Sequence, residues 1–191
     1  MASLMLVSCT VNADLGGASA TDASALADGH SCIGSLSNIG TADFHISFSV
    51  VTTESGPIAI VNERDHCGYG MFWDVRVFGG QIRVETDDEM RASDPSAHPL
   101  TELFGTKRVD DGQPHRVMIW RKSQTITIFV DGVTAGSASS TSSFGQLSPP
   151  VSETDPCDGQ GCSQVPLFGS VCRDNTKPFA GTLSNLCLES P

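Results

Sequence analysis

Hydrophobic and polar residues alternate in short runs along most of this chain. Between Phe44 and Val50 every second residue is apolar, and the residues between them are His45, Ser47 and Ser49. A period of two is typical of a strand with one face in a core and the other in solvent. The same reasoning predicts strands over residues 57–62, 71–77, 81–85, 115–120, 125–130, 165–171 and 182–188.

Glycine, proline and short polar turns separate these predicted strands. Gly79-Gly80 joins residues 71–77 to 81–85 as a hairpin, and residues 122–124 turn the next hairpin. No window keeps a helical period for more than about two turns. Residues 86–109 and 135–164 are expected to form two long loops. The pattern therefore predicts an all-β fold, a two-sheet antiparallel sandwich.

Composition narrows the classes of function. The chain has 191 residues, with 11 Lys and Arg against 22 Asp and Glu, and its formal net charge is −11. A chain this acidic is not expected to bind the phosphate backbone of nucleic acids. No stretch reaches the roughly 20 apolar residues that a membrane-spanning helix needs. These features leave a soluble β domain.

The seven cysteines predict disulfide bonds and an oxidising compartment. They are Cys9, Cys32, Cys67, Cys157, Cys162, Cys172 and Cys187. No pair has the C-x-x-C spacing of a zinc site. We favour a Cys157–Cys162 disulfide, because the glycines between them allow a tight loop. Cys172–Cys187 and Cys32–Cys67 are further expected pairs, and free buried thiols are the alternative.

The odd cysteine has a candidate explanation at the start of the chain. Leu6-Val7-Ser8-Cys9 resembles the lipobox of bacterial lipoproteins, in which the cysteine is lipidated, although a basic segment before it is missing. An ordinary apolar strand is the alternative. We therefore divide the chain into residues 1–24, an N-terminal strand or signal remnant plus linker, and residues 25–191, the folded domain. The expected location is secreted or at the cell surface, with a possible lipid anchor at Cys9.

Three segments carry a resemblance to a known family. They are 37–50, then 111–121 with 125–132, and finally 167–171 with 178–186. In this order and spacing they resemble a laminin-G-like domain of the concanavalin A-like lectin/glucanase superfamily, over residues 25–189. The resemblance implies a jelly roll of two antiparallel sheets that binds glycans or proteins. Pro114 departs from it, because the family usually has an aromatic residue before the histidine.

The resemblance also implies a possible calcium site at a loop rim. In family members that bind Ca²⁺, one ligand is the aspartate of an Asp-Gly-x-x-His turn, which is Asp111 in this chain. A backbone carbonyl near Val130 is the second expected ligand, and Asp155 or Asp158 from a later loop is the third. Such a mixture of carboxylate and carbonyl oxygens suits Ca²⁺. The alternative is that Asp111 only caps a turn.

Carboxylates at Glu85, Asp87 and Glu89 raise the question of catalysis. On a strand they share one face, as in some glucanases of the resembled superfamily. The residues between them, Thr86 and Asp88, are polar rather than core-forming, so we expect a solvated strand end.

A second catalytic possibility is lyase chemistry. It would need a tyrosine and a histidine on one sheet, and the chain offers only Tyr69 with His66 in a glycine-flanked loop. The residues therefore favour a non-catalytic domain over a glycoside hydrolase or a polysaccharide lyase, without settling the matter.

Candidate ligand-binding residues come from the polar sides of the strands. Trp120 faces the side of its strand opposite to that of Val117 and Ile119, so it is expected to be exposed. A residue that stacks on a sugar must be exposed. His45, Arg76 and Arg83 are expected on solvated faces, where they could line a groove. Phe72, Phe78 and Phe129 are also expected to point outward.

The sequence thus predicts a non-catalytic, extracytoplasmic binding module that recognises a glycan or an extracellular protein through loop-rim residues, with Ca²⁺ as a possible cofactor. The alternatives are a glycoside hydrolase or polysaccharide lyase on the same scaffold, and a structural or adhesive module of a cell-surface lipoprotein.

Overall fold

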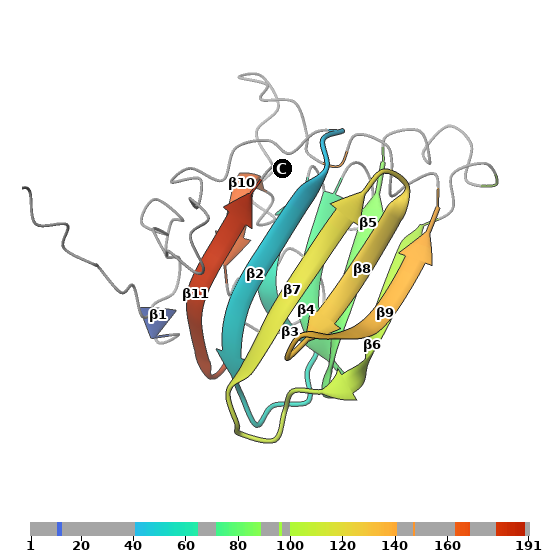
Figure 1. Ribbon diagram of the computed structural model, residues 1–191. Helices are drawn as coiled ribbons and strands as arrows, with labels where there is room; N and C mark the ends of the chain where they lie inside the picture. The colour runs from blue at the N-terminus through green and yellow to red at the C-terminus, as the bar shows by residue number, and fades with distance from the viewer. Residues whose placement is uncertain are drawn as a thin grey trace, which may run out of the picture.

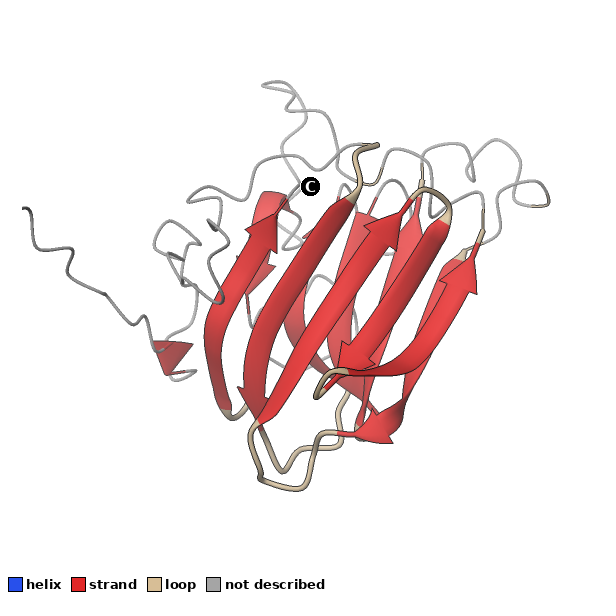
Figure 2. Ribbon diagram, in the orientation of Figure 1, coloured by secondary structure: helices blue, strands red, loops and turns tan. Residues whose placement is uncertain are grey.

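The computed structural model describes residues 11–12, 41–64, 72–88, 96, 100–140, 147, 163–168 and 179–189. These residues form strands and turns, and none of them is helical (Figure 2). The strands are β1 (Val11–Asn12), β2 (Phe44–Val51), β3 (Ile58–Arg64), β4 (Phe72–Phe78), β5 (Gln81–Asp87), β6 (Thr101–Arg108), β7 (His115–Lys122), β8 (Thr125–Val130), β9 (Val133–Ser139), β10 (Ser163–Phe168) and β11 (Thr182–Glu189).

The strands build two antiparallel sheets that lie face to face (Figure 1). The first is the six-stranded sheet, in the order β1-β11-β2-β7-β8-β9, and the second is the five-stranded sheet, in the order β10-β3-β4-β5-β6. Strand β2 pairs with β7 and β11 rather than with β3, which follows it in sequence. This arrangement is a jelly-roll sandwich, so the predicted fold class is confirmed.

The core lies between the sheets and is made by the apolar positions of the alternation. Strand register stacks Val75 of β4 beside Val84 of β5, and Ile119 of β7 beside Ile128 of β8. Trp73 is the largest fully buried side chain. The inward-facing residues of both sheets thus bury the apolar area that stabilises the fold.

Two strands occupy segments that were expected to be loops. Strand β6 lies within residues 86–109, and β9 extends to Ser139, inside the second expected loop. The two strands are edges of different sheets and meet on one side of the sandwich, where the Thr106 hydroxyl donates to the carbonyl of Ala135 at 3.0 Å. Gly136 allows this approach, because a Cβ there would lie 2.8 Å from the carbonyl oxygen of Phe104. Gly105 and the charged end of β6, and the small residues of β9, had hidden the strand character of these segments.

One end of the core is polar. The indole Nε1 of Trp73 donates to Oε2 of Glu63 at 3.0 Å, and both residues are buried. Arg121 is 2% exposed, lies over the ring of Phe44, and donates to the carbonyl of Ala42. Burial lowers the pKa of Arg121 to about 10, so its side chain stays charged at neutral pH.

Several sequence expectations fall outside the described residues. They are the lipobox and Cys9, the His66 and Tyr69 pair, Glu89, Asp155 and Asp158, and six of the seven cysteines. Cys187 is described, and it is buried and disulfide-bonded. The proposed pairings therefore stay predictions, as do the domain boundaries, although Val11 and Asn12 of the expected N-terminal segment pair with β11. No helix in the described part of the chain is long and apolar enough to cross a membrane.

Candidate functional site

A row of aromatic side chains lies on the outer face of the six-stranded sheet. Trp120 of β7 is 42% exposed. This exposure confirms what the alternation of its strand predicts. The ring of His45, directly opposite on β2, lies 6.0 Å from the Trp120 ring, and the ring of Phe129 on β8 lies 5.3 Å from it. Both neighbours meet the indole edge-on, a favourable aromatic arrangement that holds its orientation.

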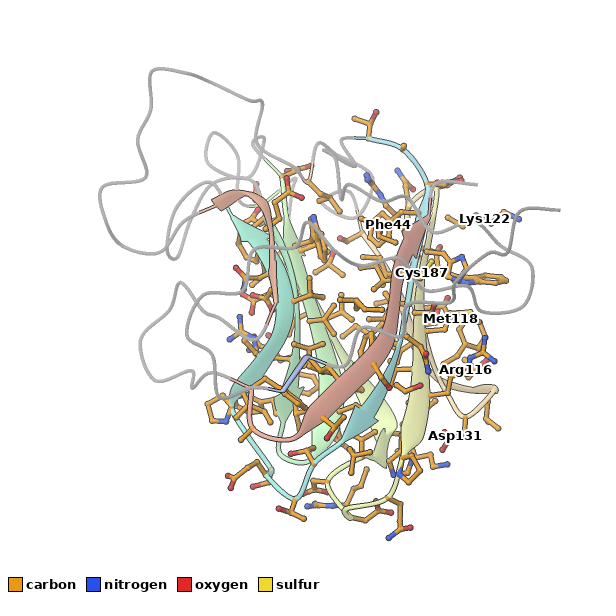
Figure 3. The ribbon with its side chains drawn as sticks, turned by 90° about the vertical axis from the view of Figure 1, so that its left-hand side faces the viewer. Phe44, Arg116, Met118, Lys122, Asp131 and Cys187 are labelled. Atoms are coloured by element: carbon orange, nitrogen blue, oxygen red, sulfur yellow. The ribbon has the colours of Figure 1, made fainter. Side chains whose placement is uncertain are left out.

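Strand register explains why these rings meet. The β7–β8 hairpin turns at Ser123 and Gln124, so Trp120 pairs with Thr127, and Met118 pairs with Phe129. Phe129 is therefore the diagonal neighbour of Trp120 on the same face. Figure 3 shows Met118, together with Arg116 and Lys122, pointing away from the space between the sheets.

Hydroxyl groups flank the aromatic row on its β9 side. The hydroxyls of Thr127 and Ser137 lie 3.1 Å apart, and those of Thr125 and Ser139 lie 2.6 Å apart. Each pair joins β8 to β9 and faces outward. A hydroxyl has one donor and two acceptor positions, so each pair keeps further hydrogen-bonding capacity for a ligand.

The outer face of the five-stranded sheet is different, and here two expectations are wrong. Arg76 and Arg83 were expected on a solvated face, but they are 4% and 8% exposed. Arg76 forms an ion pair with Asp74, and Arg83 forms ion pairs with Glu85 at 2.8 Å and with Glu102 at 2.5 Å. The alternation placed these arginines correctly outside the core, but a position outside the core is not always solvated.

Arg83 is further enclosed by aromatic rings. Its guanidinium carbon lies 5.3 Å from the ring centre of Phe78 and 5.5 Å from that of Phe104. Both rings are 40% exposed, whereas Phe72 on the same face is buried. The guanidinium is thus held by carboxylates and rings of the protein itself.

The four predicted ligand-binding residues therefore do not form one site. His45 and Trp120 lie on the six-stranded sheet, and Arg76 and Arg83 lie on the opposite outer face of the sandwich, with the core between them. The structure brings the first two together and separates them from the others.

The carboxylates of β5 are not a solvated strand end, contrary to expectation. Glu85, Asp87 and Asp88 are at most 2% exposed. The Glu85 carboxylate lies between Arg83 and Arg76, at 2.8 and 3.6 Å. The Glu85 carboxylate is therefore part of a buried ion-pair network with two guanidinium groups.

A histidine links two turns at one rim of the sandwich. His115 opens β7 and is 7% exposed. Its Nε2 lies 2.9 Å from Oδ1 of Asp111, and its Nδ1 lies 2.9 Å from Oδ2 of Asp131. Asp131 also accepts from Nζ of Lys107 at 2.5 Å and from the backbone N–H of Arg116 at 2.9 Å. Both ring nitrogens can donate only when the imidazole is protonated.

The hydrogen bonds shift the pKa values of this group. Burial lowers the pKa of His115, but the hydrogen bonds to Asp131 and Asp111 outweigh it, so the pKa lies above the usual 6.5. Burial raises the pKa of Asp131, but hydrogen bonds from Lys107, His115 and the backbone N–H of Arg116 outweigh it and bring the pKa to about 2. The two carboxylates therefore favour the protonated form of His115, which can donate a hydrogen bond to each of them.

This arrangement predicts a pH-dependent stability. The contribution of His115 is fully present below about pH 6.5 and is lost as the pH rises through its higher folded-state pKa. That of Asp131 is present above about pH 3.8 and is lost as the pH falls toward 2. We expect the difference in unfolding free energy between the parent and a His115→Gln variant to decrease from about pH 6 to about pH 9. Urea titrations of both proteins over this range measure the difference. A difference that stays constant over this range would contradict the assignment.

The described residues do not by themselves make the expected calcium site. Oδ1 of Asp111 already accepts from the backbone N–H of Gln113 and lies 2.9 Å from Nε2 of His115, an imidazole that opposes a neighbouring cation when it is protonated. In the part of the chain that the structure describes, no three carboxylate, histidine or cysteine side chains are grouped to hold a metal ion. With Asp158 outside that part, a site from Asp111, the Val130 carbonyl and Asp158 stays a prediction.

Sequence reasoning missed part of the aromatic face. Phe129 was expected to point outward, but its contact with Trp120 was not anticipated, nor were the hydroxyl pairs of Thr127 with Ser137 and Thr125 with Ser139. The signal available for Phe129 was the hairpin turn at residues 123–124, because a two-residue loop fixes the strand register. The hydroxyl pairs could not be predicted, because they join β8 to β9 and the alternation of residues did not reveal β9.

A family model described as the laminin G domain matches residues 51–190. A search of curated protein sequences finds no match. The fold is also similar to solved structures. Domains LG4-5 of the mouse laminin alpha1 chain match with a TM-score of 0.51 and 12% identity, over 81% of this chain and 37% of that one.

Two further structures come from bacterial proteins. CBM40 of the Ruminococcus gnavus IT-sialidase bound to alpha2,3 sialyllactose matches with a TM-score of 0.53 and 14% identity, over 78% of each chain. The botulinum neurotoxin serotype D binding domain matches with a TM-score of 0.52 and 10% identity, over 78% of this chain and 32% of that one. At these identities the likeness concerns the fold.

Proposed function

This chain belongs to the laminin G domain family, and on that premise we propose that it is a non-catalytic module that binds a saccharide on the outer face of its six-stranded sheet. The observation that carries the proposal is the exposed indole of Trp120, fixed between His45 and Phe129. An exposed, oriented aromatic ring offers a flat apolar surface to a sugar ring at little cost in side-chain entropy.

The surroundings of the indole supply the polar part of such a site. The hydroxyl pairs of β8 and β9 lie beside it and can hydrogen-bond to sugar hydroxyls. The opposite face has its arginines already paired with Asp74, Glu85 and Glu102, so it offers less unused binding capacity. The face near Trp120 is therefore the better candidate.

Related folds support a binding role without settling the ligand. The CBM40 structure holds alpha2,3 sialyllactose, and the toxin structure is described as a binding domain. The chain spans only 37% of the laminin fragment that it matches, so the partners of whole laminin chains remain proposals for it. We further propose an extracytoplasmic location with disulfide bonds, as the cysteine count predicts. A lipid anchor at Cys9 and Ca²⁺ at Asp111 are additional proposals.

A glycan array followed by titration calorimetry with the best-bound saccharide tests the function. We expect Trp120→Ala to raise Kd about thirtyfold or more, because central aromatic contacts of a binding site carry about 2 kcal/mol each. Phe78→Ala is the matched control, since Phe78 is 40% exposed on the other sheet, and it should change Kd less than about twofold. Both variants should unfold at the parent's temperature. Equal binding by parent and Trp120→Ala, or loss only in Phe78→Ala, would refute the proposed face.

A protein-binding or purely adhesive module remains the second candidate. The aromatic row would also suit a protein surface, because tryptophan is enriched at protein interfaces. The absence of any bound saccharide on the array, with the protein folded, would favour this candidate.

A further inference from the structure

A pair of exposed phenylalanines lies on the outer face of the five-stranded sheet. Phe78 ends β4, and Phe104 lies in β6, the edge strand of that sheet (Figure 1). Their ring centres lie 6.0 Å apart in an edge-to-face arrangement, and each side chain is 40% exposed. Among the described residues, Trp120 and Val133 are the other large hydrophobic residues with comparable exposure. A contiguous pair of exposed rings is typical of an interaction surface.

Two exposed residues of opposite charge flank the phenyl pair along β6. The guanidinium of Arg83, which contacts both rings, pairs with Glu102 on one side of them. On the other side Nη1 of Arg108 donates to the carbonyl of Gly79, the residue after Phe78, at 3.3 Å. Along an extended strand Glu102 and Arg108 lie up to about 20 Å apart. Four residues make up this surface, which we call the β6 face: Phe78, Glu102, Phe104 and Arg108.

Both charged groups of the β6 face are held in place but remain accessible. Oε1 of Glu102 pairs with Arg83 at 2.5 Å, and the Glu102 side chain is 42% exposed. Nε of Arg108 donates to Oδ1 of Asp110 at 2.9 Å, and the Arg108 side chain is 63% exposed. A guanidinium and a carboxylate each have more hydrogen-bonding positions than these contacts use. Because the two groups are already oriented, they lose little conformational entropy when a further partner binds.

From this arrangement we propose that the β6 face pairs with the β6 face of a second copy of this chain, about a two-fold axis. An axis near Gly105, midway between Glu102 and Arg108, sets the two β6 strands antiparallel. Glu102 of each copy then meets Arg108 of the other, and the phenyl rings of both copies meet in the centre. The face is therefore complementary to itself, as a two-fold interface requires.

Charge complementarity favours a second copy over a strongly charged partner. A strongly acidic partner would leave Glu102 opposed by a like charge, and a strongly basic one would do the same to Arg108, whereas a second copy satisfies both. The net charge of −11 opposes association at long range, but physiological salt screens it beyond about 8 Å. The surface is small, so we expect a weak dimer with a Kd of about 10 to 100 µM.

This pairing has a consequence for binding. The β6 face and Trp120 lie on opposite outer faces of the sandwich, so a dimer formed through the β6 face exposes both six-stranded sheets, on its two far sides. If the saccharide-binding function holds, such a dimer can bridge two saccharide chains. The pairing itself does not depend on that function, because the two surfaces share no residue.

Sedimentation equilibrium of the full chain in physiological salt tests the pairing. We expect a reversible equilibrium between monomer and dimer. Glu102→Lys and Arg108→Glu should each raise Kd about tenfold or more, because every substitution acts twice in a two-fold interface. An equimolar mixture of these two variants should recover the affinity of the parent, since each contact again joins opposite charges. Phe104→Ala should raise Kd about tenfold or more by removing the apolar centre.

Lys122→Glu is the matched control for Arg108→Glu. Lys122 is an exposed residue of β7 in the other sheet, and its substitution changes the net charge equally. We expect this variant to dimerise within about twofold of the parent. Its mixture with Glu102→Lys should not form a heterodimer tighter than either variant forms alone with the parent. Thermal unfolding shows that each variant is folded, and non-reducing denaturing electrophoresis shows that the dimer is not covalent.

Several results would overturn the inference. A folded chain that stays monomeric at about 0.5 mM has no such interface. A mixture of Glu102→Lys and Arg108→Glu that does not recover affinity would contradict the two-fold register. Equal losses in Lys122→Glu and Arg108→Glu would show a general charge effect, and a dimer that persists in the denaturing gel would be linked by cysteine. Each of these results leaves saccharide binding at Trp120 untouched, so the two proposals fail separately.

Discussion

A Gly56→Ala variant is expected to lose about 3 kcal/mol or more of unfolding free energy. Gly56 has a φ of +85°, a backbone conformation that side chains disfavour. A Cβ at this position would lie 1.9 Å from the carbonyl oxygen of Val77 and 3.0 Å from the backbone nitrogen of Ile58. Both are backbone atoms, so the β2–β3 connection or strand β4 would have to move. Denaturant unfolding followed by tryptophan fluorescence measures the loss.

The matched control for this prediction is Gly132→Ala. Gly132 has a φ of +77°, but nothing lies within 4 Å of a Cβ built there. The control therefore carries the backbone strain without the clash and should cost about 1 kcal/mol. A similar loss in both variants would show that the close approach to Val77 is not the cause. The comparison tests the packing of the β2–β3 connection against β4.

Removing the Glu85 carboxylate should have a comparable effect. We expect Glu85→Ala to lower the unfolding free energy by about 3 kcal/mol, because it leaves two buried guanidinium groups, those of Arg76 and Arg83, with one carboxylate partner fewer. Asp74 and Glu102 remain as partners and moderate the loss. Denaturant unfolding of parent and variant at neutral pH measures the difference.

Glu102→Ala serves as the control for Glu85→Ala. Glu102 also pairs with Arg83, at 2.5 Å, but its side chain is 42% exposed, and an ion pair in solvent contributes about 1 kcal/mol or less. Saccharide binding by the folded Glu85→Ala protein should match that of the parent, because the two outer faces are separated by the core. Loss of binding with the fold preserved would instead favour a site on the five-stranded sheet and would reopen the enzyme alternative.

The alternation of residues predicted which side of a strand each residue faces. In β7 it correctly placed Val117 and Ile119 in the core and Trp120 outside it. This success has a simple cause: in an extended chain successive side chains point to opposite faces, whatever the rest of the fold does. The same reasoning identified β2 and β8 and the turn between β7 and β8.

Alternation did not predict the solvent exposure of the outward residues. Arg76, Arg83 and Glu85 lie outside the core, yet all are buried. Whether an outward residue is solvated depends on its neighbours on adjacent strands and on the chain that covers them, and neither is encoded in the local pattern. The sequence interpretation therefore took an internal ion-pair network for a solvated groove and a solvated strand end.

Two strands were missed because their stabilising contacts come from distant residues. Strand β6 contains Gly105 and a charged end, and β9 is rich in small residues, so neither has a strong local preference for extended structure. Each is the edge of a sheet, and the contact between the two edges holds both in place. A contact between Thr106 and Ala135 cannot be inferred from either segment alone.

Strand alternation predicted a two-sheet sandwich with Trp120 on an outer face, and the resemblance of the ordered segments implied that the sandwich is a jelly roll. The alternation depends on the order of residues along an extended chain, which is local information. Folding was needed to bring His45 beside Trp120 from a distant strand, and to place Arg76 and Arg83 on the opposite face of the sandwich. Strand pairing in a jelly roll joins segments far apart in sequence, and so the composition of each face depends on pairings that no local pattern specifies.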